Sequence, residues 1–459
     1  MFKQAEILFV NDQQITTQLK QFTESDKTSY HVTLLNDELT VIITKIHSDQ
    51  LDDIRMMAGS IARDLGKRHV ETAVVSGTNL TKTYTNFSDD DVVTAFVEGW
   101  HLGSYEFVKY KTKNKGSKTQ LEVAEVGSLT NAVEKGETRA EAMMFSRDLM
   151  NELSNVLNPE TFPHVLKEKF AGENINITIH DQAALEKMEM NGVLAVARGS
   201  DYEPAFVELT YCTDPSKPLV ALVGKGVTFD TGGISLKGGR NISDMRMDMG
   251  GAAAVAGAMQ LLVQSEAQVN VVALIPMVEN MPDSKSLLPG EVIHYKNDCT
   301  VQVGNTDAEG RLILADGLIR SGELGAEYVV DIATLTGAIG TALGSKLAGV
   351  FGDEQLATDM KQIGDHNGEF NWPMPLVDAY DRYLRSDYAD VSNISNKGEA
   401  GAITAGLFLR NFVPESSKWL HVDMAGVMES QENGYYSKAG SGFGARLLAD
   451  YAVHVSNLK

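Results

Sequence analysis

The chain of 459 residues carries a formal net charge of -22, with 43% hydrophobic and 22% charged residues. This length exceeds what one hydrophobic core usually supports, so two domains are expected, and the charge argues against binding to nucleic acid or to an anionic membrane surface. No apolar run approaches the roughly 20 residues of a membrane helix, and the N-terminus lacks the pattern of a signal peptide, so we expect a cytoplasmic protein.

Residues 1–136 are predicted to form a small α/β domain. Short β-branched or aliphatic runs predict strands at Ala5–Val10, Val32–Leu35, Thr40–Ile46 and Val70–Val75. Apolar residues at helical spacing predict a helix over Gln50–Leu65, and Ser88-Asp89 is a plausible cap for a helix over Val92–Tyr105. The polar segment Lys111–Thr119 is expected to be a solvated turn. No residue set in this domain has catalytic spacing.

Residues 137–154 are interpreted as a connecting helix, because Thr138–Leu153 is rich in Ala, Met, Glu and Leu. Another helix is expected next, with Pro159 near its first turn, where proline is tolerated. Residues 155–459 then alternate between strands and helices. The expected strands are Ile175–Ile179, Leu219–Val223, Val269–Pro276 and Tyr328–Ala333, and the expected helices are Gln182–Met188, Gly250–Val263 and Arg311–Leu324. This order predicts a larger α/β domain with a mostly parallel central sheet flanked by helices.

Ligands of such sheets bind beyond the carboxyl ends of the strands. Two segments expected to be loops, Gly224–Asp230 and Thr334–Gly337, follow strands directly. Nearby glycine-rich segments carry the carboxylates Asp230, Asp248, Asp307 and Glu309. Asp307 and Glu309 lie two residues apart in a segment expected to be extended, so their side chains should point the same way.

Four clustered carboxylates would repel one another and raise each other's pKa values, and divalent cations relieve that repulsion. Oxygen-rich ligation suits Mg, Mn or a carboxylate-bound Zn. Two such ions about 3.5–4 Å apart would let a bridging water ionise near neutral pH. The carboxylate set therefore predicts a two-metal hydrolytic site.

Other motifs fit the sequence poorly. Asn305–Asp316 resembles the start of an EF-hand loop, but its twelfth residue is Asp, its first is Asn, and a strand is expected before it. Gly224-Lys225-Gly226 lacks the following Ser or Thr and the earlier Gly of a phosphate-binding loop. Cys212 and Cys299 lack CxxC spacing. They could form one disulfide, but we expect two free thiols in a reducing cytosol.

The segments VGKGVTFDTGGISLK (Val223–Lys237) and NTDAEGRL (Asn305–Leu312) resemble the signatures of the leucyl aminopeptidases, also called the cytosol aminopeptidase family. The similarity extends to SRDLMNELSNVLNPETF (146–162), DMGGAAAV (248–255), ATLTGA (333–338), GAITAGLFLRNFV (401–413) and WLHVDMAG (419–426). The N-terminal domain matches only in outline.

This resemblance implies two divalent metal ions per subunit, with Mn or Zn favoured and Mg or Co as alternatives. One ion would be held by Lys225, Asp230, Asp248 and Glu309, and the other by Asp230, Asp307 and Glu309. Lys225 would ligate as a neutral amine, so desolvation and the adjacent cations must depress its pKa from about 10.4. Lys237 would keep its charge and stabilise the oxyanion of the tetrahedral intermediate, and Arg311 would hold a bicarbonate ion as general base.

The resemblance also implies a substrate pocket formed by Met245, Asn305, Ala308, Thr334, Leu335 and Gly337. The free amine of a peptide would bind one metal, and a hydroxide bridging the metals would attack the first peptide bond. The expected activity is removal of amino-terminal residues, preferably apolar ones such as leucine, by a homohexamer built as two trimers. The alternative is a non-catalytic or DNA-binding regulator on the same fold.

Overall fold

The computed structural model describes residues 3–25, 28–113, 116–238 and 242–458. The chain divides into two compact units. The N-terminal unit comprises Met1–Met144, His366–Gly368 and Ser430–Ala439, and the C-terminal unit comprises Phe145–Asp365, Glu369–Glu429 and Gly440–Lys459. The division falls inside helix α5 (Thr130–Asn151), which begins before the helix expected from Thr138. The domain limits expected at residues 136 and 154 lie on either side of this division and stay a prediction.

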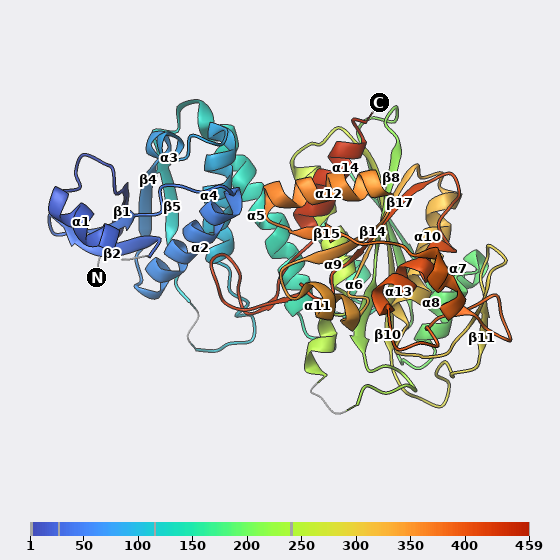
Figure 1. Ribbon diagram of the computed structural model, residues 1–459. Helices are drawn as coiled ribbons and strands as arrows, with labels where there is room; N and C mark the ends of the chain where they lie inside the picture. The colour runs from blue at the N-terminus through green and yellow to red at the C-terminus, as the bar shows by residue number, and fades with distance from the viewer. Residues whose placement is uncertain (1–2, 26–27, 114–115, 239–241, 459) are drawn as a thin grey trace. The chain divides into compact units, whose positions relative to one another are not determined.

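The described part of the N-terminal unit contains a five-stranded sheet with helices beside it (Figure 1). In spatial order the strands are β2 (Tyr30–Leu35), β3 (Glu38–Ile43), β1 (Gln4–Phe9), β4 (Thr72–Ser76) and β5 (Gln120–Ala124). The helices are α1 (Thr17–Ser25), α2 (Leu51–Lys67), α3 (Gly77–Thr83) and α4 (Asp89–Gly103). The predicted strands and helices are confirmed with small shifts in their limits, whereas α1, α3 and β5 have no clear local signal. The turn expected at Lys111–Thr119 includes residues 114 and 115, which lie outside the described residues.

Helices α2 and α4 pack at short range in the core of the N-terminal unit. A Cβ atom added at Gly103 of α4 would lie 2.3 Å from the Cα of Gly59 in α2, so only glycine allows this approach. Ser88 caps α4, as predicted, because its side chain accepts a hydrogen bond of 3.1 Å from the Asp91 amide. Trp100 of α4 is fully buried against this core.

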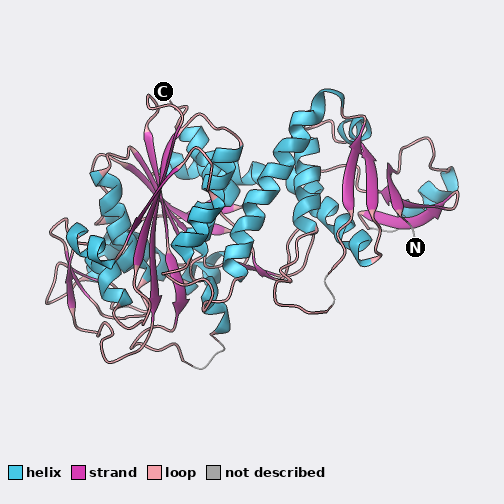
Figure 2. Cartoon of the chain, turned by 180° about the vertical axis from the view of Figure 1, so that it is seen from behind, coloured by secondary structure: helices cyan, strands magenta, loops and turns pink. Residues whose placement is uncertain are grey.

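The described part of the C-terminal unit contains a nine-stranded sheet with helices on both faces (Figure 2). Eight strands follow the order β15 (Asn371–Pro373), β14 (Ala348–Gly352), β17 (Lys418–Asp423), β13 (Tyr328–Ala333), β8 (Leu219–Gly224), β10 (Asn270–Asn280), β7 (Ala205–Cys212) and β6 (Asn176–His180), and β9 (Gly226–Asp230) also pairs with β10. The central strands β17, β13, β8 and β10 are parallel, whereas β14 and β7 run antiparallel to their inner neighbours. The predicted two-part α/β fold with a mostly parallel central sheet is confirmed.

The helices of the C-terminal unit cover both faces of this sheet. They are α6 (Phe162–Lys169), α7 (Gln182–Met188), α8 (Asn191–Ala197), α9 (Gly250–Gln264), α10 (Gly310–Glu323), α11 (Gly337–Leu343), α13 (Gly401–Arg410) and α14 (Ala445–Val455), with α12 (Glu354–Asn367) ending at the division of the units. Helices α9 and α14 pack on one face, and α10 packs with α8 and α13 on the other. None of the described helices is both long and apolar enough to cross a bilayer.

Short elements complete the described chain. The short strands are β11 (Val292–His294), β12 (Thr300–Gln302), β16 (Val391–Ser392), β18 (Glu429–Ser430) and β19 (Ala439–Gly440), and the 3-10 helices are η1 (Gly127–Leu129), η2 (Ser243–Met247) and η3 (Asp378–Leu384).

The proline in the first turn of α6 is Pro163, so the expected place of Pro159 is wrong. Pro159 instead lies in a turn where the Asn158 side chain accepts hydrogen bonds from the next amides. Cys212 and Cys299 are free thiols, as expected.

The loop expected at Gly224–Asp230 is also wrong, because most of it is strand. Strand β10 is long enough to pair first with β8 and then, further along, with β9. Lys225 stands at the break between β8 and β9, and its amide donates to the Ile332 carbonyl of β13 at 3.1 Å. Asp230 therefore lies at the carboxyl end of a paired strand rather than within a free loop.

Candidate metal centre

Lys225 is the buried cation on one side of the candidate site. Its Nζ lies 2.8 Å from both carboxylate oxygens of Asp248 and 2.9 Å from Glu309 Oε1. It also donates to the Thr334 carbonyl at 3.1 Å, while the Thr334 hydroxyl donates to Asp248 Oδ1 at 2.7 Å. One ammonium group thus joins residues from four places in the fold: the β8–β9 break, the end of η2, the start of α10 and the end of β13.

Lys237 joins a second pair of carboxylates. Its Nζ lies 2.6 Å from Asp230 Oδ2 and 2.5 Å from Asp307 Oδ1. The other oxygen of Asp230 accepts hydrogen bonds from the Gly232 amide at 2.9 Å and from Asn280 Nδ2 at 2.8 Å. Gly232 has a φ of +90°, a conformation that favours glycine. Neutral donors therefore fix one oxygen of Asp230 and leave the other facing the cation.

Asp230, Asp307 and Glu309 each offer a carboxylate oxygen within 4.8 Å of the others. The expected extended conformation between Asp307 and Glu309 is wrong. The Asn305 side chain accepts a hydrogen bond from the Asp307 amide at 2.8 Å, which favours a turn, and Glu309 already has helical dihedrals at the start of α10. This turn, and not the alternation of a strand, brings the two carboxylates to the same site.

The donor set fits a divalent cation. Glu309 Oε2 is buried, and none of the described residues gives it a hydrogen bond. An unpaired buried carboxylate oxygen is costly, on the order of 1–3 kcal/mol or more for a charged group. A hard metal ion among carboxylate oxygens would satisfy it.

Burial and charge crowding shift the pKa values of these groups. Burial, together with the charge of Glu309, raises the pKa of Asp230 to about 6 although both lysines oppose the shift. Burial likewise raises the pKa of Asp248 well above its usual range. Burial lowers the pKa of Lys225, but Asp248 and Glu309 outweigh that effect and the pKa is raised. Metal ligation by Lys225 requires a lowered pKa, and desolvation alone does not lower it. Other cations must first balance the charges of the carboxylates.

Arg311 follows Glu309 in the first turn of α10 and is buried. Its Nη1 donates to the Asn393 carbonyl at 2.7 Å, and its guanidinium lies 5.9 Å from the ring centre of Phe408. Burial lowers the pKa of Arg311 to about 10, with the charges of Glu309 and Asp423 opposing the shift. Its Nε is buried without a hydrogen-bond partner among the described residues, so the guanidinium keeps a donor for an anion.

One cavity of about 710 Å³ brings together every site residue expected from the sequence. These are Lys225, Asp230, Lys237, Met245, Asp248, Asn305, Asp307, Ala308, Glu309, Arg311, Thr334, Leu335 and Gly337. The volume is that of a small-ligand site. The segment Ile394–Gly401 also contributes lining residues, including Lys397 and Glu399, for which no sequence motif predicted a role. Asn280 and Asn393, which hold the site from behind, were missed too, because no local pattern marks a buried amide.

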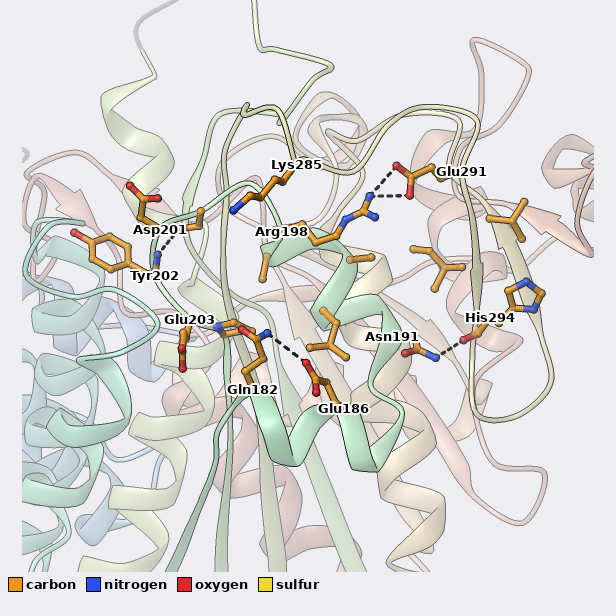
Figure 3. A pocket seen from close by; sticks show the side chains of 17 residues that line it. Gln182, Glu186, Asn191, Arg198, Asp201, Tyr202, Glu203, Lys285, Glu291 and His294 are labelled. Carbon is orange, nitrogen blue, oxygen red and sulfur yellow. Dashed lines mark hydrogen bonds and ion pairs between the residues drawn. The ribbon is translucent and has the colours of Figure 1, made fainter.

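A second cavity, of about 690 Å³, lies between α7, α8 and β11 (Figure 3). Arg198 and Glu291 face each other there in an ion pair of 2.7 Å. None of the expected site residues, all of which the structure describes, lines this cavity. The first cavity is therefore the candidate functional site.

Comparisons with known proteins identify the family to which the chain belongs. Residues 144–449 match the model of the cytosol aminopeptidase family, catalytic domain, and residues 48–114 match its N-terminal domain. A probable cytosol aminopeptidase of Persephonella marina is 36% identical over 411 residues, which cover 88% of this chain and 82% of the relative. One of Solibacter usitatus is 40% identical over 375 residues, which cover 80% and 78%.

Solved structures share the whole fold. The bottromycin maturation enzyme BotP is 29% identical to this chain, with a TM-score of 0.89, and the match covers 100% of both chains. A structure of BotP in complex with Mn gives the same values. Together with the family match over the C-terminal unit, these findings show that the chain belongs to the cytosol aminopeptidase family and that its class of activity is that of an aminopeptidase.

Proposed function

We propose that this protein is a metal-dependent aminopeptidase that removes apolar residues, leucine among them, from the free amino terminus of peptides. The observation that carries the proposal is the meeting of Asp230, Asp248, Asp307 and Glu309 around two lysines in one cavity, with a buried oxygen of Glu309 left unpartnered. A cluster of this kind is unfavourable unless cations balance it.

The residues present would hold two divalent ions. Asp230 and Glu309 would serve both ions, with Lys225 and Asp248 on one side and Asp307 on the other. When bound, such ions polarise a scissile carbonyl and lower the pKa of water toward neutrality. Mn or Zn is proposed because oxygen-rich sites accept them, and the Mn complex of the structural relative supports Mn.

The side chains of the protein would orient and neutralise the reacting groups. Lys237 reaches the carboxylates of Asp230 and Asp307 and would give a charged donor to the oxyanion that develops at the carbonyl. Arg311 would bind bicarbonate with the help of its unpartnered Nε, and that anion would accept the proton of the attacking water. Met245, Asn305, Ala308, Thr334, Leu335 and Gly337 would contact the substrate.

Two further properties belong to the proposal. The relatives are named cytosol aminopeptidases, which supports a cytoplasmic location. A homohexamer built as two trimers follows from the family resemblance and is tested by sedimentation velocity, where a mass near that of a single chain would exclude it.

The proposal is tested with leucine p-nitroanilide and purified protein. We expect hydrolysis that is lost after treatment with a chelator and returns with Mn or Zn. A mobility-shift assay at physiological salt should show no binding to DNA. Inactivity with every divalent metal, together with a clear DNA shift, would instead favour the regulatory alternative.

A further inference from the structure

We propose that Asn393 is a positioning residue for the reaction, because its side chain fixes the turn that carries Asp307 and Glu309 and its backbone fixes Arg311. This inference rests on the proposed function and deepens it. Asn393 lies outside the segments that resemble the family signatures. Among the described residues its side chain forms hydrogen bonds with backbone groups, and none with a carboxylate of the cluster or with a side chain of the expected substrate residues.

The Asn393 amide uses its full hydrogen-bonding capacity on one turn. Its Oδ1 accepts from the amides of Gly304 at 2.8 Å and Asn305 at 3.2 Å. Its Nδ2 donates to the carbonyls of Asn305 at 2.7 Å and Ala308 at 3.3 Å. A side-chain amide offers two donors and two acceptor positions, so Asn393 is satisfied on both sides. An aspartate there could keep the two acceptor contacts but would lose both donors.

The backbone of Asn393 connects this turn to a paired strand and to the guanidinium. Its amide donates to the Gln302 carbonyl of β12 at 3.0 Å, directly beyond the pairing of β12 with β16. Its carbonyl accepts the 2.7 Å hydrogen bond from Arg311 Nη1. Asn393 is completely buried, so water cannot replace these contacts. Asn393 thus connects both the turn and the arginine to the same strand.

The position of this turn decides the geometry of the carboxylates. Ala308 lies between Asp307 and Glu309, and its carbonyl is one of the groups that Asn393 holds. The turn lies between β12 and α10, outside any strand pairing or helix, so its place depends on side-chain contacts. Residues that orient metal ligands from behind typically change metal affinity or activity by about 10- to 100-fold when they are lost.

The test compares Asn393→Ala and Asn393→Asp with the control Asn371→Ala. Asn371 is also buried and also donates to two backbone carbonyls, those of Met360 and Glu369, but it lies on β15 and does not line the cavity. Three quantities are measured. Isothermal titration gives the Mn²⁺ affinity, hydrolysis of leucine p-nitroanilide gives kcat and KM, and amide hydrogen exchange is followed over residues 304–311.

We expect both Asn393 variants to weaken Mn²⁺ binding and to lower kcat by about 10- to 100-fold, with faster exchange in residues 304–311. Asn371→Ala should lower the unfolding midpoint but keep Mn²⁺ affinity and kcat near those of the wild type. Asn393→Asp preserves the side-chain size, so a folded variant remains for study if the alanine variant unfolds. Mn²⁺ affinity and kcat within twofold of the wild type in folded Asn393 variants would overturn the inference alone. A wild-type protein that neither binds Mn²⁺ nor hydrolyses the substrate would overturn the proposed function and this inference with it.

Discussion

Asp307 and Glu309 are separated by one residue, yet each carboxylate is paired with a different lysine. Asp307 Oδ1 lies 2.5 Å from Lys237 Nζ, whereas Glu309 Oε1 lies 2.9 Å from Lys225 Nζ. Because Asp230 and Asp248 complete the two sets, the turn before α10 divides four carboxylates between two positive centres. This division is the feature that supports the proposed two-ion site.

Asp307→Asn should leave the fold intact and remove most of the activity. The substitution takes one negative charge from the cluster, and the ions of such sites supply several kcal/mol of transition-state stabilisation, so kcat should fall by at least about 100-fold. The unfolding midpoint should change little, because the Asp307 side chain is 31% exposed and Lys237 keeps its contact with Asp230. The measurement is hydrolysis of leucine p-nitroanilide beside a thermal unfolding curve. Asp378→Asn serves as control, because Asp378 is exposed and, among the described residues, forms an ion pair with Arg410 alone. Equal rates in the two variants would refute the role of Asp307.

Arg311→Lys should separate anion binding from metal binding. Lysine keeps a positive charge but loses the planar set of donors that suits bicarbonate. We expect a loss of roughly 100-fold in kcat, the lower end of what general acid–base catalysis contributes, with unchanged Mn²⁺ affinity. Rates measured in carbonate-free buffer and with added bicarbonate should differ in the wild type and not in the variant. A variant that responds to bicarbonate as the wild type does would exclude Arg311 as its site.

Lys397→Met should change the preference among short substrates. Lys397 lines the cavity from an exposed segment, and its ammonium makes no ion pair with the described residues, whereas its neighbour Glu399 accepts a hydrogen bond from Tyr383. We therefore expect Lys397 to attract the carboxylate of a dipeptide, an exposed contact that changes kcat/KM by roughly two- to fivefold. The ratio of kcat/KM for Leu-Gly over leucinamide should fall in Lys397→Met and persist in Lys397→Arg. An unchanged ratio in both variants would show that this lysine does not contact the substrate.

The stability of the C-terminal unit should depend on the proton of His421. His421 Nδ1 lies 2.5 Å from Asp331 Oδ1, and both side chains are fully buried. Burial lowers the pKa of His421, but the charge of Asp331 outweighs it and the pKa is raised. The folded chain thus holds this proton more tightly than the unfolded chain, where the pKa is about 6.5. The resulting stabilisation is complete below about pH 6.5 and is lost as the pH rises through the raised pKa.

Urea unfolding of the wild type and of His421→Gln between pH 6 and 9 measures this effect. Above pH 6.5 the difference in the free energy of unfolding should shrink by up to about 1.4 kcal/mol per pH unit. A difference that stays constant over this range would mean that His421 does not carry the proton in the folded chain.

Elements with strong local signals could be predicted from the sequence. The limits of α7 and β13 agree with the expected ranges, because an aspartate cap and a buried aliphatic run mark them. β9 could not be predicted, since its strand character depends on pairing with the far half of β10. The residues proposed for the site were found by motif, but the turn at Asp307 was not, because it depends on a hydrogen bond that the Asn305 side chain accepts from a backbone amide. Asn280 and Asn393 carry no signal before the chain is folded, since their partners lie far away in sequence.

The most direct test of the central claim is a crystal of the protein soaked in Mn²⁺, with anomalous scattering recorded at the manganese edge. The claim predicts two anomalous peaks in the cavity, both in contact with Asp230 and Glu309, one also beside Asp248 and the other beside Asp307. No peak among these carboxylates, or a single peak elsewhere on the chain, would contradict it.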